Sequence, residues 1–359
     1  MEENKNLDDT QMHAAYLTDK GKGKLEYGVL ERPKPGRGQV LIRVEAAPLN
    51  PSDIYCMEGR YGEFADFKYP FTPGWEGSGT VIESGGGIHA WYLNGKRVAF
   101  SKCNEDLTGG EIKVGGCYAQ YAITNAYQCV PLDDDVSFSA GASFFVNPMT
   151  AVGLEEEVRK DRGTSVILTA GASQLAKMIT RLLSNDVTVI STVRKETQRE
   201  ELHKAFPEAL DNGRLIVLNT EDDGFLEEFK NTVKENNCKH LLECIAGSMC
   251  GKLLSVMPEK SKVVLYGALS RSNVSEIDPF SIINNQLILK GFLLTHWVES
   301  KNLLSLIFII RKVKGMLQND LSSEIQKEYD LKDIKDAIAF YEDNMSGGKV
   351  ILKPWGVEN

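Results

Sequence analysis

Residues 165–195 carry the pattern that most restricts how this chain can fold. An apolar segment at 166–168 is followed by the small-residue turn Thr169-Ala170-Gly171-Ala172-Ser173, a predicted helix at 174–183 and a second apolar segment at 187–193. Five of the seven residues from Ala170 to Ala176 are Gly, Ala or Ser. Strand, tight turn, helix and strand in this order predict a βαβ unit with two parallel strands.

The turn of this unit predicts a dinucleotide site. Backbone N–H groups at the start of a helix bind a pyrophosphate where small side chains let the ligand approach closely. We therefore expect cofactor contacts from Gly171, Ser173, Gln174 and Leu175. The usual fingerprint has three glycines and this turn supplies only Gly171, so an ordinary parallel βαβ unit with a small-residue turn is the alternative.

The residues after the second strand indicate which dinucleotide is bound. Enzymes that use NAD commonly end this strand with Asp or Glu, which accepts hydrogen bonds from the ribose hydroxyls and would repel a 2′-phosphate. Here Val193 is followed by Arg194 and Lys195. A guanidinium binds phosphate in bidentate geometry, and the lysine adds a second positive charge. The sequence therefore predicts NADP(H) as the cofactor.

The rest of the chain predicts two domains, since 359 residues with 42% hydrophobic composition suffice for two cores. Segments of β type, separated by Gly and Pro, predict a compact, mostly β domain first; they lie at 40–46, 79–84, 97–100 and 117–124. From Thr150 strands and helices alternate, which predicts a parallel sheet covered on both faces. Further strands are expected at 214–218, 239–244, 262–266 and 286–294, and helices at 225–235 and 249–256. A last helix and a strand at 349–352 are expected to return to the first domain.

Composition and charge argue against several classes of protein. The net charge is −9 and no long basic run occurs, so no nucleic-acid partner is expected. The longest apolar stretch, 303–310, is far shorter than the roughly 20 residues of a membrane span. Residues 1–11 resemble neither a signal peptide nor a transit peptide, which favours a cytoplasmic location and leaves a mitochondrial one open. The 7 cysteines contain no C-x-x-C pair and the 5 histidines are scattered, so reduced thiols and no metal site are expected.

Five motifs follow one another along nearly the whole chain. They are Leu49-Asn50-Pro51-Ser52-Asp53, Pro73-Gly74-Trp75-Glu76-Gly77-Ser78-Gly79, Gly95-Lys96-Arg97-Val98, Val146-Asn147-Pro148-Met149-Thr150-Ala151 and Gly348-Lys349-Val350-Ile351-Leu352. In this order they resemble the medium-chain dehydrogenase/reductases, and within them the zinc-free quinone oxidoreductases and 2-enoyl thioester reductases. The resemblance implies an α/β fold: a GroES-like, mostly β catalytic domain at 1–146 and 298–359, and a Rossmann domain with a doubly wound parallel sheet, binding NADP, at 147–297. It also implies a small-molecule substrate held between the two domains.

The resemblance further implies chemistry without zinc. Zinc alcohol dehydrogenases have Cys and His where this chain has Asn50 and Trp75, and neither residue offers a thiolate or an imidazole. Without a Lewis acid, the easier reaction is hydride transfer to an already activated acceptor such as a quinone, an enone or an enoyl thioester. The expected activity is that of an NADPH-dependent oxidoreductase, with oxidation of an activated alcohol as the least favoured reading.

Two catalytic residues are expected from the first domain. Tyr61, in a G-x-Y-G motif that resembles that of the enoyl thioester reductases, would donate a hydrogen bond to the carbonyl oxygen as negative charge develops there. The alternative is a loop aromatic that packs at the mouth of the site. Asn50 would bind substrate or the nicotinamide ribose, or else cap its own turn together with Ser52 and Asp53.

The remaining expected cofactor contacts are Thr150, Tyr266, Gly267, Phe292, Leu293 and Lys349. The resemblance places Thr150 beside the nicotinamide. Residues 266–267 close a predicted strand, and ligands lie at the carboxyl ends of parallel strands. Residues 292–293 are expected to shape the same pocket. Lys349 is expected to reach the cofactor phosphates, with a solvated strand position as the alternative.

Two expectations concern assembly. The apolar edge strand expected at 286–294 can pair with its twin in a second copy, which predicts a homodimer through the Rossmann domains. The incomplete glycine turn also supports an alternative function, in which the chain is catalytically weak or inactive and serves as a binding or structural subunit of a larger assembly.

Overall fold

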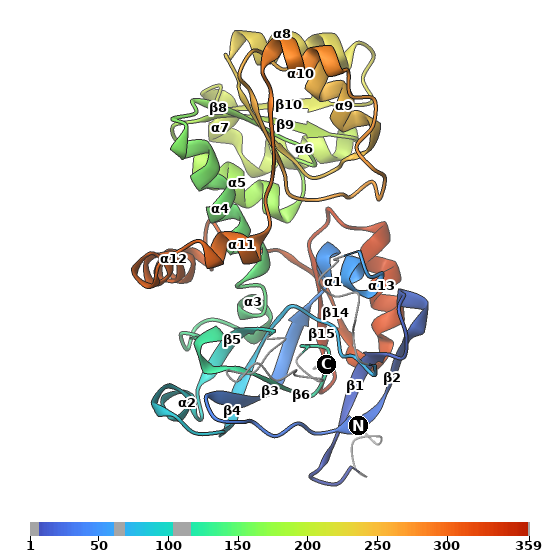
Figure 1. Cartoon of the computed structure of the whole chain (residues 1–359), viewed down its shortest axis with the longest axis vertical. Coiled ribbons are helices and arrows are strands. Elements are labelled where there is room, and N and C mark those ends of the chain that lie inside the picture. The colour runs from blue at the N-terminus through green and yellow to red at the C-terminus, as the bar shows by residue number, and fades with distance from the viewer. Residues whose placement is uncertain (1–6, 61–68, 103–115, 358–359) are drawn as a thin grey trace. The chain divides into compact units, whose positions relative to one another are not determined.

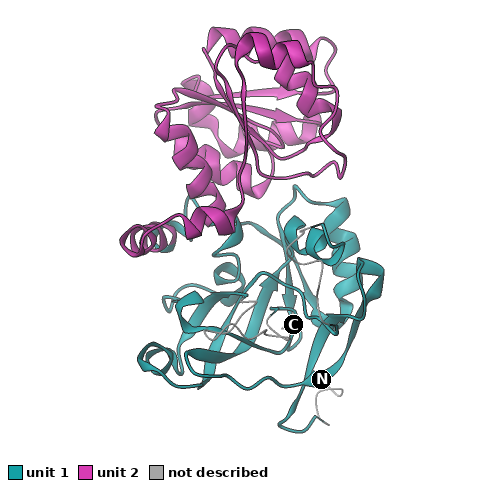
Figure 2. Ribbon diagram, viewed as in Figure 1, with its two compact units in different colours: residues 1–148, 314–359 teal, residues 149–313 magenta. Residues whose placement is uncertain are grey.

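The computed structural model describes residues 7–60, 69–102 and 116–357. It divides into two compact units (Figure 2): unit 1 is Met1–Pro148 with Lys314–Asn359, and unit 2 is Met149–Val313. The second boundary lies later than the expected residue 298. Two ion pairs join the residues before this boundary to helix α4 (Val146–Lys160): Lys301 pairs with Glu156, and Lys312 with Glu155.

Unit 1 is built on a sheet of seven strands in the described part of the chain. These strands are β3 (Gln39–Pro48), β4 (Glu76–Ser84), β5 (Arg97–Ser101), β6 (Tyr121–Asn125), β7 (Cys129–Pro131), β14 (Ile325–Asp330) and β15 (Lys349–Lys353). The order is β14-β15-β3-β4-β5-β7, with β6 also paired to β3. Strand β15 runs antiparallel to β3, with Ile351 opposite Pro48, which confirms the predicted return of the chain to the first domain.

The other elements of unit 1 cover this sheet or extend from it (Figure 1). A separate hairpin pairs β1 (Gln11–Leu17) with β2 (Leu25–Glu31). The helices are α1 (Pro51–Met57), α2 (Ile88–Leu93), α3 (Phe138–Gly141) and α13 (Ile334–Asp343), and short 3-10 turns lie at η2 (Lys22–Lys24), η4 (Ala126–Gln128) and η5 (Leu331–Asp333). The core gathers apolar side chains from β3, α1 and α13, among them Ile42, Ile54 and Ile338.

Unit 2 contains a parallel sheet of six strands in the order β10-β9-β8-β11-β12-β13. Its strands are β8 (Ser165–Leu168), β9 (Thr188–Val193), β10 (Leu215–Asn219), β11 (His240–Glu243), β12 (Lys262–Leu265) and β13 (Ile288–Gly291). Its helices, after α4, are α5 (Gln174–Leu183), α6 (Glu196–Ala205), α7 (Pro207–Asp211), α8 (Phe225–Glu235), α9 (Gly247–Ser255), α10 (Pro279–Asn285), α11 (Leu294–Glu299) and α12 (Leu303–Met316). The strand order reverses between β8 and β11. Strands β8 and β9 are buried along their whole length, as a sheet covered on both faces requires.

The predicted fold class is confirmed, and two of its elements are shorter than expected. The strand expected at 286–294 covers only β13, because a helix begins at Leu294. The strand expected at 117–124 begins at Tyr121, because the N–H groups of Cys117 and Tyr118 donate to the loop carbonyls of Gly74 and Pro73 instead of to a strand.

Candidate functional site

The turn between β8 and α5 has the backbone form of an anion site. Ala170 lies at φ 51°, a left-handed conformation that turns the chain sharply after the strand. The Ser173 hydroxyl caps α5 by accepting the Ala176 N–H at 3.2 Å, and the Ser173 N–H donates to the Ala170 carbonyl at 2.9 Å. The N–H groups of Gln174 and Leu175 lie in the first turn of this helix, where the helix supplies no acceptor of its own.

Gly171 is the residue that joins this turn to β9. Its N–H donates to the Thr192 carbonyl at 2.9 Å. A Cβ atom added at Gly171 would lie 2.7 Å from the Cβ of Ser191. The single glycine kept by this turn is therefore the one that the close approach between turn and strand demands.

Arg194 and Lys195 follow β9 directly, and both are exposed. The Arg194 backbone N–H donates to Gln198 Oε1 at 3.1 Å. In the described ranges neither of the two side chains forms an ion pair or a hydrogen bond, whereas the next arginine, Arg199, pairs with Glu196 and Asp222. Two cationic side chains are thus open to an anion at the carboxyl end of β9.

Other predicted residues lie at the ends of β12 and β13. Tyr266 and Gly267 follow β12, and a Cβ atom at Gly267 would lie 3.0 Å from both the Cβ and the carbonyl oxygen of Cys244. This close contact holds the loop after β12 against the loop after β11. Thr150 is half-buried on α4.

Phe292 and Leu293 have different environments. The Phe292 ring lies 6.3 Å from the Trp297 ring between centroids, and its Cζ would be 2.6 Å from a Cβ atom at Gly153. Leu293 is 36% exposed. In this structure Phe292 therefore packs between α4 and α11, and of the two side chains Leu293 has the more open surface.

Unit 1 contains a buried polar network around Asn50. Its four members, Asn50, Asp53, Glu76 and Lys349, are at most 3% exposed. Asn50 Nδ2 donates to Glu76 Oε1 at 3.1 Å, and Asn50 Oδ1 accepts from Lys349 Nζ. The backbone N–H groups of Asn50 and Trp75 donate to the Asp53 carboxylate at 2.8 and 2.9 Å. We call these four residues the Asn50 network.

Glu76 connects this network to the start of α4. Its Oε2 atom accepts the backbone N–H groups of Phe145 and Val146 at 2.8 and 2.9 Å. Val146 is the first residue of α4, the helix that carries Thr150. Glu76 thus fixes the chain where it leaves the first part of unit 1.

Burial dominates the ionisation of the network. It raises the pKa of Asp53 to about 6, although the two backbone donors favour its charged form. Burial also raises the pKa of Glu76, against the opposing effect of the Lys349 charge, and lowers the pKa of Lys349.

The sequence predicted no role for Asp53 beyond the local turn and none for Glu76. An acidic residue opening a buried strand was the available signal, because such a residue needs a partner.

The structure places the remaining predicted residues as follows. The Lys349 side chain is not exposed to solvent. Strand β15 runs beside β3, and the Leu49 N–H donates to the Val350 carbonyl. This pairing brings Lys349 next to Asn50. The Asn50 turn is closed by the Asp53 carboxylate. Tyr61 lies outside the described residues.

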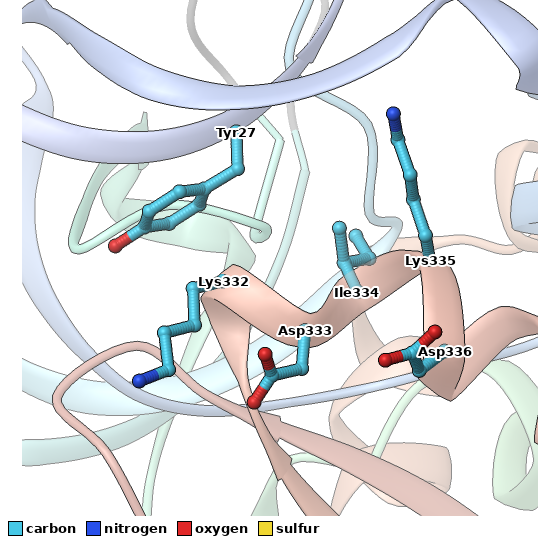
Figure 3. A pocket seen from close by; sticks show the side chains of 6 residues that line it. All are labelled: Tyr27, Lys332, Asp333, Ile334, Lys335 and Asp336. Carbon is cyan, nitrogen blue, oxygen red and sulfur yellow. The ribbon is translucent and has the colours of Figure 1, made fainter.

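A surface hollow of about 310 Å³ lies elsewhere in unit 1. Tyr27 of β2 and residues 332–336 line it, as Figure 3 shows, and its charged side chains are two lysines and two aspartates. None of the predicted site residues lines this hollow.

Two kinds of feature are absent from the described residues. No group of three or more His, Cys, Asp and Glu side chains in those residues is arranged to hold a metal ion. Among the same residues, no helix has the length and apolar character needed to cross a membrane.

Several known proteins are similar to this chain. Residues 36–134 match the alcohol dehydrogenase GroES-like domain. The chain is 24% identical over 355 residues to the synaptic vesicle membrane protein VAT-1 homolog-like of Mus musculus, covering 92% of this chain and 78% of that protein. It is 26% identical over 268 residues to the mitochondrial enoyl-[acyl-carrier-protein] reductase of Mus musculus, covering 73% and 66%.

Solved structures agree with these relatives. A protein from Mesorhizobium loti, assigned as an NADPH:quinone reductase, superposes with a TM-score of 0.82 at 28% identity, covering 97% of this chain and 100% of that one. A mycobacterial protein in complex with NADPH superposes with a TM-score of 0.77 at 24% identity, covering 96% and 100%. Together with the GroES-like unit and the six-stranded parallel sheet, these matches confirm the resemblance to the medium-chain dehydrogenase/reductases seen in the motifs.

Proposed function

We propose that this protein is an NADPH-dependent, zinc-independent oxidoreductase that reduces an activated acceptor, namely a quinone, an enone or an enoyl thioester. The observation that carries the proposal is the exposed pair Arg194 and Lys195 directly after β9, beside a turn that Gly171 holds close to the same strand. The names of the quinone reductase and enoyl reductase relatives support the same class of reaction.

The residues of unit 2 fit NADP(H). Arg194 and Lys195 would bind the 2′-phosphate, since both cations are exposed and have no acidic partner in the described ranges. Gly171, Ser173 and the first-turn N–H groups of Gln174 and Leu175 would bind the pyrophosphate. When bound, this cofactor supplies the hydride.

The proposed contacts to the nicotinamide are inferred from where the residues lie in the sheet. Thr150 on α4, and Tyr266 and Gly267 after β12, are the proposed contacts, because ligands of such sheets lie beyond the carboxyl ends of the strands. Leu293 is proposed as a pocket residue through its exposed surface, and Phe292 as the packed residue that holds it in place.

The donors around Asn50 support the proposed zinc independence. The amide is held between Glu76 and Lys349, so an ammonium group already lies beside Asn50, the residue that replaces the thiolate ligand of the related zinc enzymes. A second positive charge at this position would be repelled. The indole of Trp75 is not a zinc ligand. Lys349 is accordingly proposed as a positioning residue for Asn50 instead of a phosphate ligand.

An activated acceptor suits this donor set. As hydride reaches the far carbon, negative charge develops on the carbonyl oxygen and needs a hydrogen-bond donor. The proposed donor is Tyr61, whose phenol supplies the O–H group. Asn50 is proposed to help orient the substrate or the ribose, with its amide held by Glu76 and Lys349.

A second candidate function is a catalytically inactive subunit that binds other proteins in a larger assembly. The observation that favours it is Gln174, the first residue of α5, which stands where the family commonly has glycine and is only 4% exposed. A long side chain there would crowd the pyrophosphate.

The proposed assembly is a homodimer through β13, and the proposed location is the cytoplasm. Strand β13 is the last strand of its sheet, and Ile288 and Leu289 are 55% and 39% exposed. On α10, the helix before it, Phe280 and Ile283 are 67% and 66% exposed. An uncovered edge strand beside apolar side chains suits pairing with a second copy.

The activity is tested by following NADPH oxidation with a panel of quinones, enones and enoyl thioesters, in buffer with and without a metal chelator. We expect turnover of at least one acceptor class and no effect of the chelator. Activity that a chelator abolishes and zinc restores would contradict zinc independence. Tight NADPH binding without turnover of any acceptor would favour the inactive subunit.

A further inference from the structure

The loops that follow β8 and β11 are tied together by a buried pair, Thr169 and Glu243, both at 0% exposure. Thr169 follows the last residue of β8, and Glu243 is the last residue of β11. These two strands are neighbours in the sheet, and the strand order reverses between them. Doubly wound sheets bind their ligands beyond the strand ends at such a reversal.

The hydroxyl of Thr169 both donates and accepts a hydrogen bond. Its O–H group lies within donating distance of Glu243 Oε1, at 3.2 Å, and of the Leu242 carbonyl, at 3.4 Å, and its oxygen accepts the backbone N–H of Cys244 at 2.9 Å. The residues after Thr169 are Ala170 and Gly171 of the anion-binding turn. The hydroxyl therefore links the start of that turn to the end of β11.

Glu243 holds the other loop. Its Oε1 accepts the Ile245 N–H and its Oε2 accepts the Ala246 N–H, both at 2.8 Å. Ala246 lies at φ 62° and ψ −150°, a conformation that residues other than glycine rarely adopt. A strained backbone of this kind persists where surrounding contacts determine it, and the Glu243 carboxylate provides them.

We infer that Thr169 and Glu243 are positioning residues for the cofactor: their hydrogen bond sets the spacing between the turn at 170–173 and the loop at 244–247. This inference rests on the proposed NADPH function. Neither side chain needs to touch the cofactor. Removing the Thr169 hydroxyl releases both loops together and lowers the affinity for the dinucleotide.

The test compares Thr169→Val with Thr180→Val. The Thr180 hydroxyl is equally buried but donates only to the Ala176 carbonyl within α5, at 2.9 Å, so its loss leaves both loops in place. We expect Thr169→Val to weaken NADPH binding by about tenfold in calorimetry, and Thr180→Val and Thr169→Ser to bind nearly as wild type does. Equal losses of affinity in Thr169→Val and Thr180→Val would overturn the inference.

Hydrogen exchange of the free protein provides a readout that does not depend on the cofactor. We expect Thr169→Val to speed exchange at the Ile245 and Ala246 amides as well as in the 170–173 turn, and Thr180→Val to leave both loops unchanged. Unchanged exchange at Ile245 and Ala246 in Thr169→Val would refute the proposed link between the two loops, even if NADPH binds. The converse result is a wild type that fails to bind NADPH while exchange in Thr169→Val still speeds up in both loops. That result would refute the proposed function but would support the link between the two loops.

Glu243→Gln completes a double-mutant cycle. A glutamine offers one acceptor oxygen and an NH₂ group, which cannot serve both the Ile245 and Ala246 amides. If the two residues act as one unit, the loss of NADPH affinity in the double variant is smaller than the product of the two single losses. Independent losses that simply multiply would contradict the inference.

Discussion

Asp53 illustrates how a buried side chain makes stability depend on pH. It is fully buried, and two backbone N–H groups donate to it, yet burial still raises its pKa to about 6. An unfolded aspartate has a pKa of about 3.9. Between these two values the folded protein holds a proton that the unfolded chain has lost. The stability from this group is therefore present at low pH and decreases as pH rises through this window.

Asp53→Asn tests this ionisation. A difference of about two pKa units corresponds to ~3 kcal/mol, so we expect the wild type to lose up to that much free energy of unfolding, relative to the variant, between about pH 4 and about pH 7. Urea unfolding across this range measures it, with the exposed Asp223→Asn as control. A constant difference between wild type and Asp53→Asn over the whole range would show that Asp53 does not titrate there.

Gly171 gives a second prediction at the residue scale. The Cβ of Gly171→Ala would lie 2.7 Å from the Cβ of Ser191, so the turn must move away from β9. We expect a loss of about 1–3 kcal/mol in stability and weaker NADPH binding. Adding Ser191→Gly should restore much of both, since it removes the opposing atom. Gly315→Ala, in open space on α12, is the control in thermal unfolding, and a fully stable Gly171→Ala would count against this contact.

Some of the proposed site residues are predicted from a local sequence pattern, and their contacts to a cofactor stay predictions. Gly171, Ser173 and Arg194 all lie within one βαβ unit, whose pattern is continuous in the chain. The Asn50 network could not be predicted, because Lys349 meets Asn50 across 299 positions and only the pairing of β15 with β3 brings them together. The prediction that Lys349 contacts phosphate lacked this information.

At the scale of elements, the Asn50 network joins the starts of α1, β4 and β15. The Lys349 ammonium is the cation that faces the buried Glu76 and Asp53 carboxylates within it. Removing one partner of a buried charge pair leaves the other uncompensated. The network therefore holds these three elements together only while all its members are present.

Lys349→Met measures this dependence. We expect a loss of about 3–5 kcal/mol in the free energy of unfolding, and a smaller loss when Glu76→Gln is added, because the uncompensated carboxylate is then gone. Lys353→Met, in the same strand but half-buried, is the matched control. Denaturant titration gives all the values. Additive effects of Lys349→Met and Glu76→Gln would show that the two side chains are not coupled.

Local sequence signals determine which helices and strands could be predicted. Helices α5 and α8 match the predicted 174–183 and 225–235, since each is bounded by polar or glycine residues that end the pattern. The hairpin of β1 and β2 went unpredicted although Gly21 and Gly23 lie between its strands, and so did β14. These three strands contain few of the β-branched residues that mark a strand. Tertiary pairing, not local propensity, makes them strands.

For the whole molecule, the proposed homodimer predicts the mass in solution and a substitution that should separate the two copies. Light scattering at micromolar concentration should give twice the chain mass. Ile288→Lys places a charge on β13 and should give monomers, whereas Ile88→Lys, at a side chain 86% exposed in unit 1, should leave the dimer intact. A monomeric wild type would refute pairing through this edge.

The central claim is that this chain binds NADPH through Arg194, and calorimetric titration of wild type and Arg194→Ala with NADPH and NADH tests it most directly. We expect tight NADPH binding by the wild type. We also expect a loss of about 1.5–3 kcal/mol for NADPH in the variant, from the missing charge-assisted hydrogen bonds, and little change for NADH. Equal losses for both nucleotides would contradict the 2′-phosphate contact. No binding of either nucleotide by the wild type would contradict the oxidoreductase account and favour the structural subunit.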